Sequence, residues 1–253
     1  MRAYIAFMKK EFRELTRTYK LLIMGILFFI LGLMNPLTAK FTPDLLKNFM
    51  PEAIQITITE PVAMDSWSQF YKNVPQMGLI IFAIVFSGMI SNELTKGTLV
   101  NMLTKGLSRK NVILAKFTSV GIVWTVSYFF CFAISYLYTK FFWSEAVPNL
   151  FFSVFCLWIF GFVIIALLLL GGVLLKSSYG SLLITAGVIG ILFLINIVPT
   201  LMDYNPLMLS SSNTALLRQE LQVSDFFAPL IVSVGMIVVS VIVSISVFNK
   251  KKL

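Results

Sequence analysis

Few side chains in this sequence could carry out covalent chemistry. Histidine is absent from the 253 residues, which removes the commonest general base and the commonest transition-metal ligand. Cys131 and Cys156 both lie within apolar runs, so we expect buried free thiols, although two thiols at similar depth on neighbouring helices could also pair. The sequence contains no Gly-x-x-x-x-Gly-Lys-Ser/Thr phosphate loop and no cluster spaced as a metal site. We therefore expect no catalytic residue, metal or cofactor in this chain.

The small and hydroxyl side chains within the apolar runs are predicted to serve packing. A nucleophilic serine or threonine needs a base beside it, and these runs offer none. Six hydroxyl groups are therefore interpreted as hydrogen-bonding to the backbone or between helices: Ser87, Ser127, Ser135, Ser153, Thr185 and Ser240. Six glycines predict close packing of the fourth and fifth apolar helices: Gly161, Gly171, Gly172, Gly180, Gly187 and Gly190.

The composition is that of an integral membrane protein. Hydrophobic residues make up 58% of the chain and charged residues 12%, whereas soluble domains have about 25% charged residues. Six apolar runs approach the roughly 20 residues that cross a bilayer as a helix. The predicted spans are 21–39, 73–92, 117–139, 150–175, 180–202 and 226–249. The sequence thus predicts an all-α membrane protein with a single transmembrane domain over residues 1–253.

The distribution of lysine and arginine predicts the orientation in the membrane. Counted on alternate sides of the six spans, fifteen of these residues lie on the side of both termini and five on the other side. The positive-inside rule assigns the richer side to the cytoplasm. We therefore expect a multi-pass protein of the plasma membrane with both termini cytoplasmic. The same rule accounts for the net charge of +9, so we do not expect nucleic-acid binding.

Residues 1–20 predict an amphipathic helix at the membrane interface. At about 100° per residue, the apolar side chains fall on one stripe and the basic side chains on the other. Such a helix lies in the interface with its cations towards anionic headgroups. The predicted membrane-interface residues are Tyr4, Met8, Phe12, Leu15, Arg13 and Arg17. The alternative is a positively charged topology anchor without this surface role.

Two long connections lie on the side opposite the termini. Residues 40–72 contain Pro43, Pro51 and Pro61, which favours short helices and turns over one continuous helix. Residues 203–225 begin near the turn signal Asn205-Pro206 and are partly apolar. This second connection is either a re-entrant segment or a short amphipathic helix on the outer surface.

The most informative polar segment runs from Asn92 to Lys116, between the second and third spans. Its side chains repeat at the spacing of one helical face at Leu94, Thr98, Leu99, Met102 and Leu103. Gly97 interrupts this face, Gly106 can supply a left-handed residue past its end, and Ser108 can cap the next helix. A short amphipathic helix here either docks into a groove of a soluble partner or lies on the lipid headgroups.

This segment resembles the signature that follows the second span of type-2 ATP-binding-cassette (ABC) transporter permeases. That signature reads Glu-x-x-x-Gly-Thr-Leu, then Leu-Ser-Arg, then Lys. The matching residues are Glu93, Gly97, Thr98, Leu99, Leu107, Ser108, Arg109 and Lys116. The amphipathic start, the six spans and the Asn-Pro loop extend the resemblance over nearly the whole chain. One departure is Asn92-Glu93-Leu94-Thr95-Lys96, where many members carry more charge around the glutamate.

The resemblance implies the membrane subunit of a bacterial ABC exporter. Two permeases, identical or similar, would pair with two cytoplasmic ATPase subunits that bind ATP and Mg, so this chain would not itself be an enzyme. Residues 1–20 would be the elbow helix and the segment after the second span the coupling helix. The expected ATPase contacts are Glu93, Gly97, Thr98, Leu99, Met102, Leu103, Lys105, Ser108 and Arg109. Glu93 either pairs with a basic residue of the ATPase or is a solvated carboxylate at a helix end.

The cargo is expected to be an amphipathic peptide, a lipid or a drug. Aromatic side chains indicate an apolar pathway, unless they face lipid instead: Trp124, Phe129, Phe130, Phe132, Phe151, Phe152 and Trp158. The alternatives to a permease are a non-transporting immunity or assembly factor and a secondary transporter. A co-purifying ATPase whose hydrolysis depends on this chain would separate the first reading from the other two.

Overall fold

The computed structural model describes residues 2–49, 60–95, 97–104 and 106–251, and this part of the chain contains helices and turns but no strand. The helices are α1 Arg2–Arg17, α2 Lys20–Phe49, α3 Ala63–Asn73, the π-helix η1 Val74–Leu79, α4 Ile80–Phe86, α5 Ser91–Thr95, α6 Thr98–Thr104, α7 Arg109–Phe142, α8 Leu150–Leu175, α9 Ser178–Ile195, α10 Pro199–Met202, α11 Met208–Ser211, α12 Asn213–Leu217, the 3₁₀-helix η2 Val223–Phe226 and α13 Phe227–Lys250. Six stretches are long and apolar enough to cross a membrane: Lys20–Pro43, Ala63–Thr95, Arg109–Phe142, Leu150–Leu175, Ser178–Ile195 and Val223–Lys250. The predicted all-α fold with six candidate membrane helices is confirmed.

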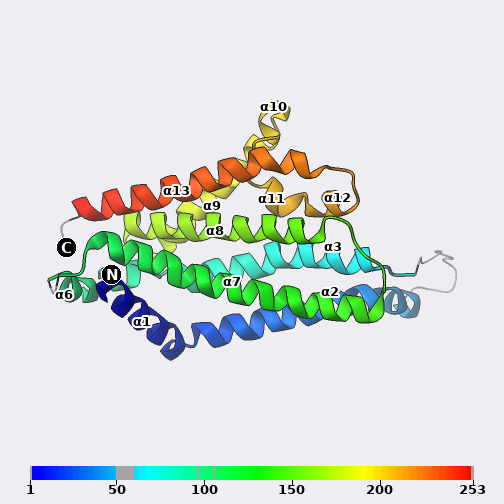
Figure 1. Cartoon of the computed structure of the whole chain (residues 1–253), viewed down its shortest axis with the longest axis horizontal. Coiled ribbons are helices and arrows are strands. Elements are labelled where there is room, and N and C mark those ends of the chain that lie inside the picture. The colour runs from blue at the N-terminus through cyan, green and yellow to red at the C-terminus, as the bar shows by residue number, and fades with distance from the viewer. Residues whose placement is uncertain (1, 50–59, 96, 105, 252–253) are drawn as a thin grey trace.

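The long helices lie side by side along the longest axis of the molecule (Figure 1). The start of α1, the short helix α6 and the end of α13 share one end of the bundle, which we call the basic end. The ends of α2 and α7 lie at the opposite end. This arrangement fits six alternating spans, and the charge count predicts that the basic end faces the cytoplasm.

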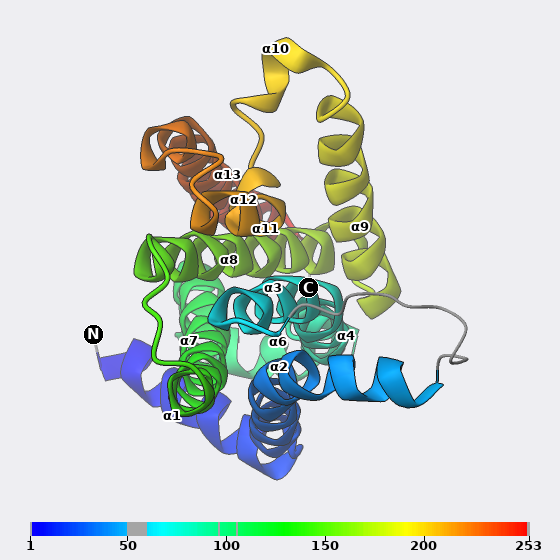
Figure 2. The same cartoon turned by 90° about the vertical axis from the view of Figure 1, so that its right-hand side faces the viewer.

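Helix α8 lies at the centre of the bundle. It packs against α7, α9 and α13, and Figure 2 shows it between α7 and α3 on one side and α11–α13 on the other. Its side chains are apolar around the whole circumference, and Leu157 and Leu169 are fully buried. By contrast, α9 contacts the bundle mainly through α8 and leaves Leu183, Ile191 and Leu194 more than half exposed.

Hydrogen bonds between side chains join α2, α3 and α7. The amide nitrogen of Asn73 donates to Oδ1 of Asn35 at 2.9 Å, and the Asn35 amide donates to Ser135 Oγ at 3.4 Å. Ser66 and Thr139 share a hydrogen bond at 2.6 Å. Polar side chains between apolar helices stabilise their association because lipid offers no alternative partner. The predicted interhelical role is confirmed for Ser135.

The glycines of α8 allow neighbouring helices to approach closely, but the neighbour is not always α9, as the sequence predicted. A Cβ on Gly161 would lie 2.1 Å from the indole of Trp124 on α7, rather than against α9. A Cβ on Gly171 would lie 2.8 Å from the backbone of Ser181 on α9, as expected. Gly187 and Gly190 on α9 have open space around the Cβ position, so close packing does not require them.

Helix α2 continues through Pro36 and Pro43 to Phe49, where the sequence predicted short helices and turns after residue 39. Proline removes one backbone donor, but neighbouring hydroxyl groups can satisfy the freed carbonyls. Pro36 frees the carbonyl of Gly32, which accepts a hydrogen bond from the Ser135 hydroxyl of α7 at 3.0 Å. The expectation of turns is therefore wrong for residues 40–49.

Helix α7 extends the predicted span 117–139 to Arg109–Phe142, and two further helices also have bounds that differ from the predicted spans. The second candidate span begins at Ala63 instead of residue 73. The Asp65 carboxylate accepts a hydrogen bond from the Val62 backbone nitrogen at 2.9 Å, and this cap starts α3 within a polar segment. Helix α9 ends at Ile195 instead of running to residue 202, since Pro199 lacks a backbone donor and disfavours helical geometry at Val198.

The segment 203–225 folds back onto the bundle. Helices α11 and α12 pack against α8, and Leu209 and Leu216 are fully buried. The amide of Asn205 donates to the carbonyl of Leu192 at 2.7 Å, and its Oδ1 accepts from the Leu207 nitrogen at 3.0 Å. Helices α11 and α12 therefore pack on the bundle, and the choice between a re-entrant segment and a helix at the outer surface stays a prediction.

Candidate functional site

The connection between α4 and α7 at the basic end has the local structure that the sequence predicts. Gly97 separates α5 from α6 with φ of 67°, and Gly106 follows α6 with φ of 89°. Both angles lie in the left-handed region that glycine adopts without a steric penalty. Ser108 caps α7, because its Oγ accepts a hydrogen bond from the Asn111 nitrogen at 3.3 Å.

The predicted docking face of this connection is partly turned into the protein. Leu99 is 1% exposed and belongs to the hydrophobic core. Leu103 is half-buried against that core, whereas Thr98 and Ser108 are exposed. Lys105 and the side chain of Met102 lie outside the described residues. The docking prediction for Leu99 is therefore corrected: α6 buries this side chain because the bundle itself offers the nearest apolar surface.

Glu93 on α5 lies within a group of charged side chains from three helices, which we call the charge cluster: Lys10, Glu11, Glu14, Glu93 and Lys116. Lys10 Nζ lies 3.0 Å from Glu11 Oε1 and 2.6 Å from Glu14 Oε2, and it also contacts Glu93 Oε1. Lys116 Nζ lies 3.0 Å from Glu11 Oε2 and 3.2 Å from Glu93 Oε1. Two ammonium groups thus bridge three carboxylates and join α1, α5 and α7.

Three members of the charge cluster are removed from solvent. Lys116 is 1% exposed, Glu11 6% and Glu93 7%. Burying an unpaired charge costs several kcal/mol, so these side chains require one another. The ring of Phe7 adds cation–π contacts, with its centroid 5.2 Å from Lys10 Nζ and 5.8 Å from Lys116 Nζ.

Lys10 and Glu14 lie on α1, outside the candidate spans, and both are held in their charged forms. Burial by itself lowers the pKa of Lys10, but hydrogen bonds to Glu14 and Glu93 outweigh burial and raise this pKa above its ordinary value. Burial by itself raises the pKa of Glu14, but the neighbouring Lys10 outweighs burial and lowers that pKa. The ion pair between them is therefore intact at neutral pH.

The surroundings of Glu93 differ from both sequence-based expectations. The sequence predicted a contact with the ATPase or a solvated carboxylate, whereas the structure pairs Glu93 with Lys10 and Lys116 of its own chain. One signal in the sequence points to this arrangement. Glu11 stands four residues from both Phe7 and Leu15, so an acid lies on the apolar face of α1.

Helix α1 packs against α7 with much of the side that was predicted to meet lipid. The hydroxyl of Tyr4 donates to Thr118 Oγ1 at 3.0 Å, and Leu15 is 6% exposed. The other two apolar members of the predicted stripe are half-buried: Met8 and Phe12. Arg13 and Arg17 are exposed on the opposite face. The interface assignment of Leu15 is therefore corrected, since this side chain lies in the protein core.

Arg109 holds the end of α13 and so is engaged within the chain. Its Nη1 donates to the carbonyl oxygens of Phe248 at 2.7 Å, Asn249 at 2.9 Å and Lys251 at 2.7 Å. The last carbonyls of a helix lack the usual donor four residues on, and a cation stabilises a helix C-terminus; here the Phe248 carbonyl also accepts from the Lys251 backbone nitrogen, at 3.3 Å. Lys251 in turn donates to the carbonyl of Leu174, at 3.2 Å, near the end of α8. These hydrogen bonds join α7, α13 and α8 at the basic end.

Replacing Arg109 with glutamine should loosen the end of α13. We expect the free energy of unfolding to fall by about 1–2 kcal/mol, because charge-assisted hydrogen bonds to carbonyls are lost. Hydrogen exchange measured by mass spectrometry should rise at residues 246–251 and stay unchanged at the start of α13. The matched control is Lys110→Gln, since Lys110 is an exposed neighbour. Equal exchange in both variants would contradict the assignment of Arg109 as a cap.

The carboxylates of the charge cluster are also close enough to be considered as a metal site. Oxygen atoms of Glu11, Glu14 and Glu93 lie within 4.8 Å of one another. However, the ammonium group of Lys10 contacts all three side chains. It takes the position that a cation would occupy, so the geometry favours an internal ion-pair network.

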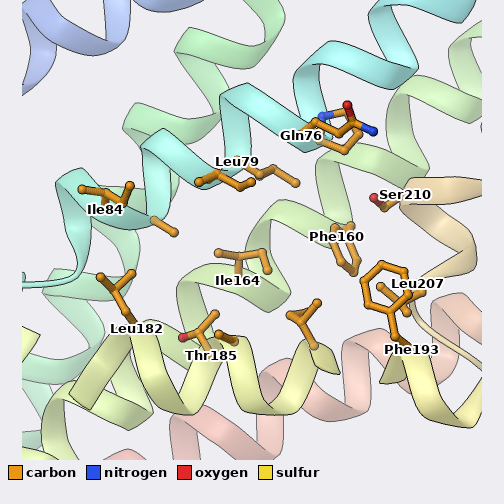
Figure 3. A pocket seen from close by; sticks show the side chains of 15 residues that line it. Gln76, Leu79, Ile84, Phe160, Ile164, Leu182, Thr185, Phe193, Leu207 and Ser210 are labelled. Atoms are coloured by element: carbon orange, nitrogen blue, oxygen red, sulfur yellow. The ribbon is translucent and has the colours of Figure 1, made fainter. Parts of the chain in front are cut away.

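An apolar pocket of about 410 Å³ opens between η1 and α4 on one side and α8, α9 and α11 on the other. Figure 3 shows Leu79 and Ile84 facing Leu182 and Phe193 across it. Its polar groups are few: Gln76, Thr185 and Ser210. Because the π-helix η1 widens the backbone turn where Gln76 and Leu79 stand, it helps to form this wall.

The sequence did not predict this pocket. None of the seven aromatic residues expected in a pathway lines it, and its aromatic side chains are Phe160 and Phe193. Trp124 lies instead in the core, stacked with Tyr128 at a centroid distance of 5.0 Å. Pro75, directly after Asn73-Val74, was the one local sign of an irregular helix here.

Comparisons with known proteins agree with this architecture. A family model described as "ABC-2 family transporter protein" matches residues 5–253. The chain is also similar to the uncharacterized transmembrane protein YxlG of Bacillus subtilis (strain 168), with 25% identity over 152 residues, or 58% of this chain. That match spans 57% of the length of YxlG. Because the family model covers nearly the whole sequence, this chain belongs to the ABC-2 family of transporter proteins.

Proposed function

We propose that this chain is the membrane subunit of an ATP-driven exporter, which works as a dimer with a separate cytoplasmic ATPase. Family membership supports the proposal. The structural observation that carries it is the charge cluster, which ties the connection after the second span to α1 and α7. ATP and Mg would be bound by the ATPase, so this chain would have no enzymatic activity of its own.

The charge cluster suits the transmission of force from the basic end into the bundle. An ATPase that displaces α5 and α6 would pull on Glu93, which is bridged to Lys116 on α7 and Lys10 on α1. Separating these buried charges is costly, so the three helices should move as one unit. Nucleotide-driven closure of an ATPase pair would then tilt α4 and α7 relative to α8.

A second permease and the cargo would meet this chain beside α9. The outer face of α9 is exposed and apolar, with Leu183, Ile191 and Leu194 uncovered in the single chain. The apolar pocket lies against the same helix, and it suits a hydrophobic chain better than a bare sugar because its walls are almost entirely apolar. We therefore propose a lipid or an amphipathic peptide as cargo.

Co-purification tests the proposal directly. A tagged chain isolated in mild detergent should retain an ATPase, and its variants should separate docking from folding. We expect Leu103→Asp to reduce ATPase retention at least tenfold, since a buried charge replaces an apolar contact. Thr98→Arg changes an exposed position on the same connection, with loss of the hydrogen bond from the Thr98 hydroxyl to the Glu93 carbonyl at 3.4 Å, and should also reduce retention. Tyr179→Asp, in the first turn of α9 at the same end, serves as the matched control because Tyr179 is exposed.

The outcomes separate this proposal from its alternatives. Retention of the ATPase, with hydrolysis that depends on the chain, supports the exporter. If Leu103→Asp and Thr98→Arg fold and retain the ATPase as Tyr179→Asp does, α6 is not the docking site. A chain that moves substrate in vesicles without any ATPase would be a secondary transporter. One that retains no ATPase and moves nothing would fit an immunity or assembly factor.

A further inference from the structure

A second cavity, of about 400 Å³, lies beside the charge cluster. Its walls come from α1, the junction of α1 with α2, the end of α4, α5 and the start of α7. The first candidate span begins at Lys20 and the second ends at Thr95, and Lys20 lines this cavity. The cavity therefore lies at the level where the candidate spans leave the membrane, which is the level of lipid headgroups.

One wall of this cavity offers positive charge and hydrogen-bond donors. The ammonium group of Lys20 forms no ion pair with any described carboxylate and lies 5.5 Å from the ring centroid of Phe86. Lys20 also begins α2, where free backbone N–H groups favour an anion. Asn92 accepts from Ser178 through Oδ1, at 3.1 Å, and its amide hydrogens have no partner among the described residues. These groups together suit a phosphate.

The cavity also offers an acceptor for a cation with N–H groups. Glu93 lines it, and the Oε2 atom of this carboxylate is buried without a hydrogen-bond partner in the described parts of the chain. Leaving such an atom unsatisfied costs about 1–3 kcal/mol, so a donor is expected beside it. Glu14 lies on the same lining with a side chain that is 46% exposed. Lys10 already pairs with Glu14 and with Oε1 of Glu93, so Oε2 of Glu93 is the acceptor left for a primary ammonium group.

The lining as a whole is balanced, with three lysines and three glutamates: Lys10, Lys20, Lys116, Glu11, Glu14 and Glu93. The carboxylates would repel a purely anionic ligand, and the lysines would repel a purely cationic one. We propose that this cavity binds a phosphoethanolamine group, with its phosphate near Lys20 and Asn92 and its ammonium near Glu93. The membrane headgroup phosphatidylethanolamine and a soluble phosphoethanolamine share this chemistry. A choline group would be disfavoured, since it has no N–H to donate to Glu93.

Native mass spectrometry tests the proposal on the full-length chain. The delipidated protein is offered equal amounts of phosphatidylethanolamine, phosphatidylcholine and phosphatidylglycerol with identical acyl chains. We expect one retained phosphatidylethanolamine per chain, and a roughly tenfold lower retained fraction in Lys20→Gln, because a charge-assisted contact to phosphate is lost. Lys9→Gln removes the same charge from the exposed face of α1 and should retain the lipid as the unchanged chain does.

A second variant and a soluble competitor complete the test. Asn92→Ala should also lower retention, and it keeps the proposal testable if Lys20→Gln does not fold. Displacement of the lipid by O-phosphoethanolamine would show that the headgroup alone suffices, whereas binding of the lipid alone would show that the acyl chains are required. Equal retention of the three lipids, or unchanged retention in both variants, would overturn the proposal.

Discussion

Replacing Lys116 with methionine is expected to lower the free energy of unfolding by about 3–5 kcal/mol. Lys116 is 1% exposed and its ammonium lies 3.0 Å from Glu11 and 3.2 Å from Glu93. Methionine fills a similar volume but leaves two buried carboxylates with Lys10 as their remaining described partner. Denaturant unfolding in mixed micelles, followed by circular dichroism, measures the change.

A double-mutant cycle separates the ion pair from the loss of packing. Glu93→Gln combined with Lys116→Met removes one charge of each sign, so the double variant should lose less stability than the sum of the single variants. Lys110→Met provides the matched control, since Lys110 is an exposed lysine on the first turn of the same helix, and its change should be within about 0.5 kcal/mol. If Lys116→Met behaved like Lys110→Met, the charge cluster would not stabilise the fold.

Replacing Gly161 with alanine is expected to destabilise the contact between α8 and α7 by about 1–3 kcal/mol or more. The added Cβ would lie 2.1 Å from Cε2 and 2.3 Å from Nε1 of Trp124, a ring that is fully buried. The ring would have to shift, which also weakens the hydrogen bond from Trp124 Nε1 to the carbonyl of Trp158, at 3.0 Å. A lower melting temperature with a changed tryptophan emission spectrum should report both effects.

The chain provides a matched control for this substitution. Gly187 also lies within a helix, but no side-chain or distant backbone atom comes within 4 Å of its Cβ position, so Gly187→Ala should be neutral or stabilising. Trp124→Leu combined with Gly161→Ala should recover part of the loss, because the smaller side chain makes room. Equal destabilisation by Gly161→Ala and Gly187→Ala would mean that helix propensity, rather than the close approach of Trp124, determines the effect.

Features set by a few neighbouring residues could be predicted from the sequence. Gly97 and Gly106 have the expected place in the connection after the second span, because only glycine adopts positive φ without a steric penalty. Ser108 caps α7 for an equally local reason. Proline was less reliable as a signal: Pro43 lies within α2, whereas Pro199 follows the end of α9.

The partners of the charged residues could not be predicted in the same way. Glu93 and Lys10 are 83 residues apart in the chain, and Lys116 and Glu11 are 105 apart. Arg109 reaches carbonyls about 140 residues further along the chain. Glu93 and Arg109 were expected at a surface because charged side chains usually lie there. The residue pattern within one helix does not specify which other helix will pack against it.

The sequence by itself determined that this is an all-α membrane protein with six apolar helices, an amphipathic first helix and a short helix after the second span. The length and periodicity of apolar residues suffice for this, since lipid permits few other structures. Only the tertiary structure decided that Glu93 and Arg109 are engaged within the chain, that Leu99 lies in the core, and that the apolar pocket forms beside α9. The physical reason is that burial and ion pairing depend on surfaces brought together from distant parts of the chain.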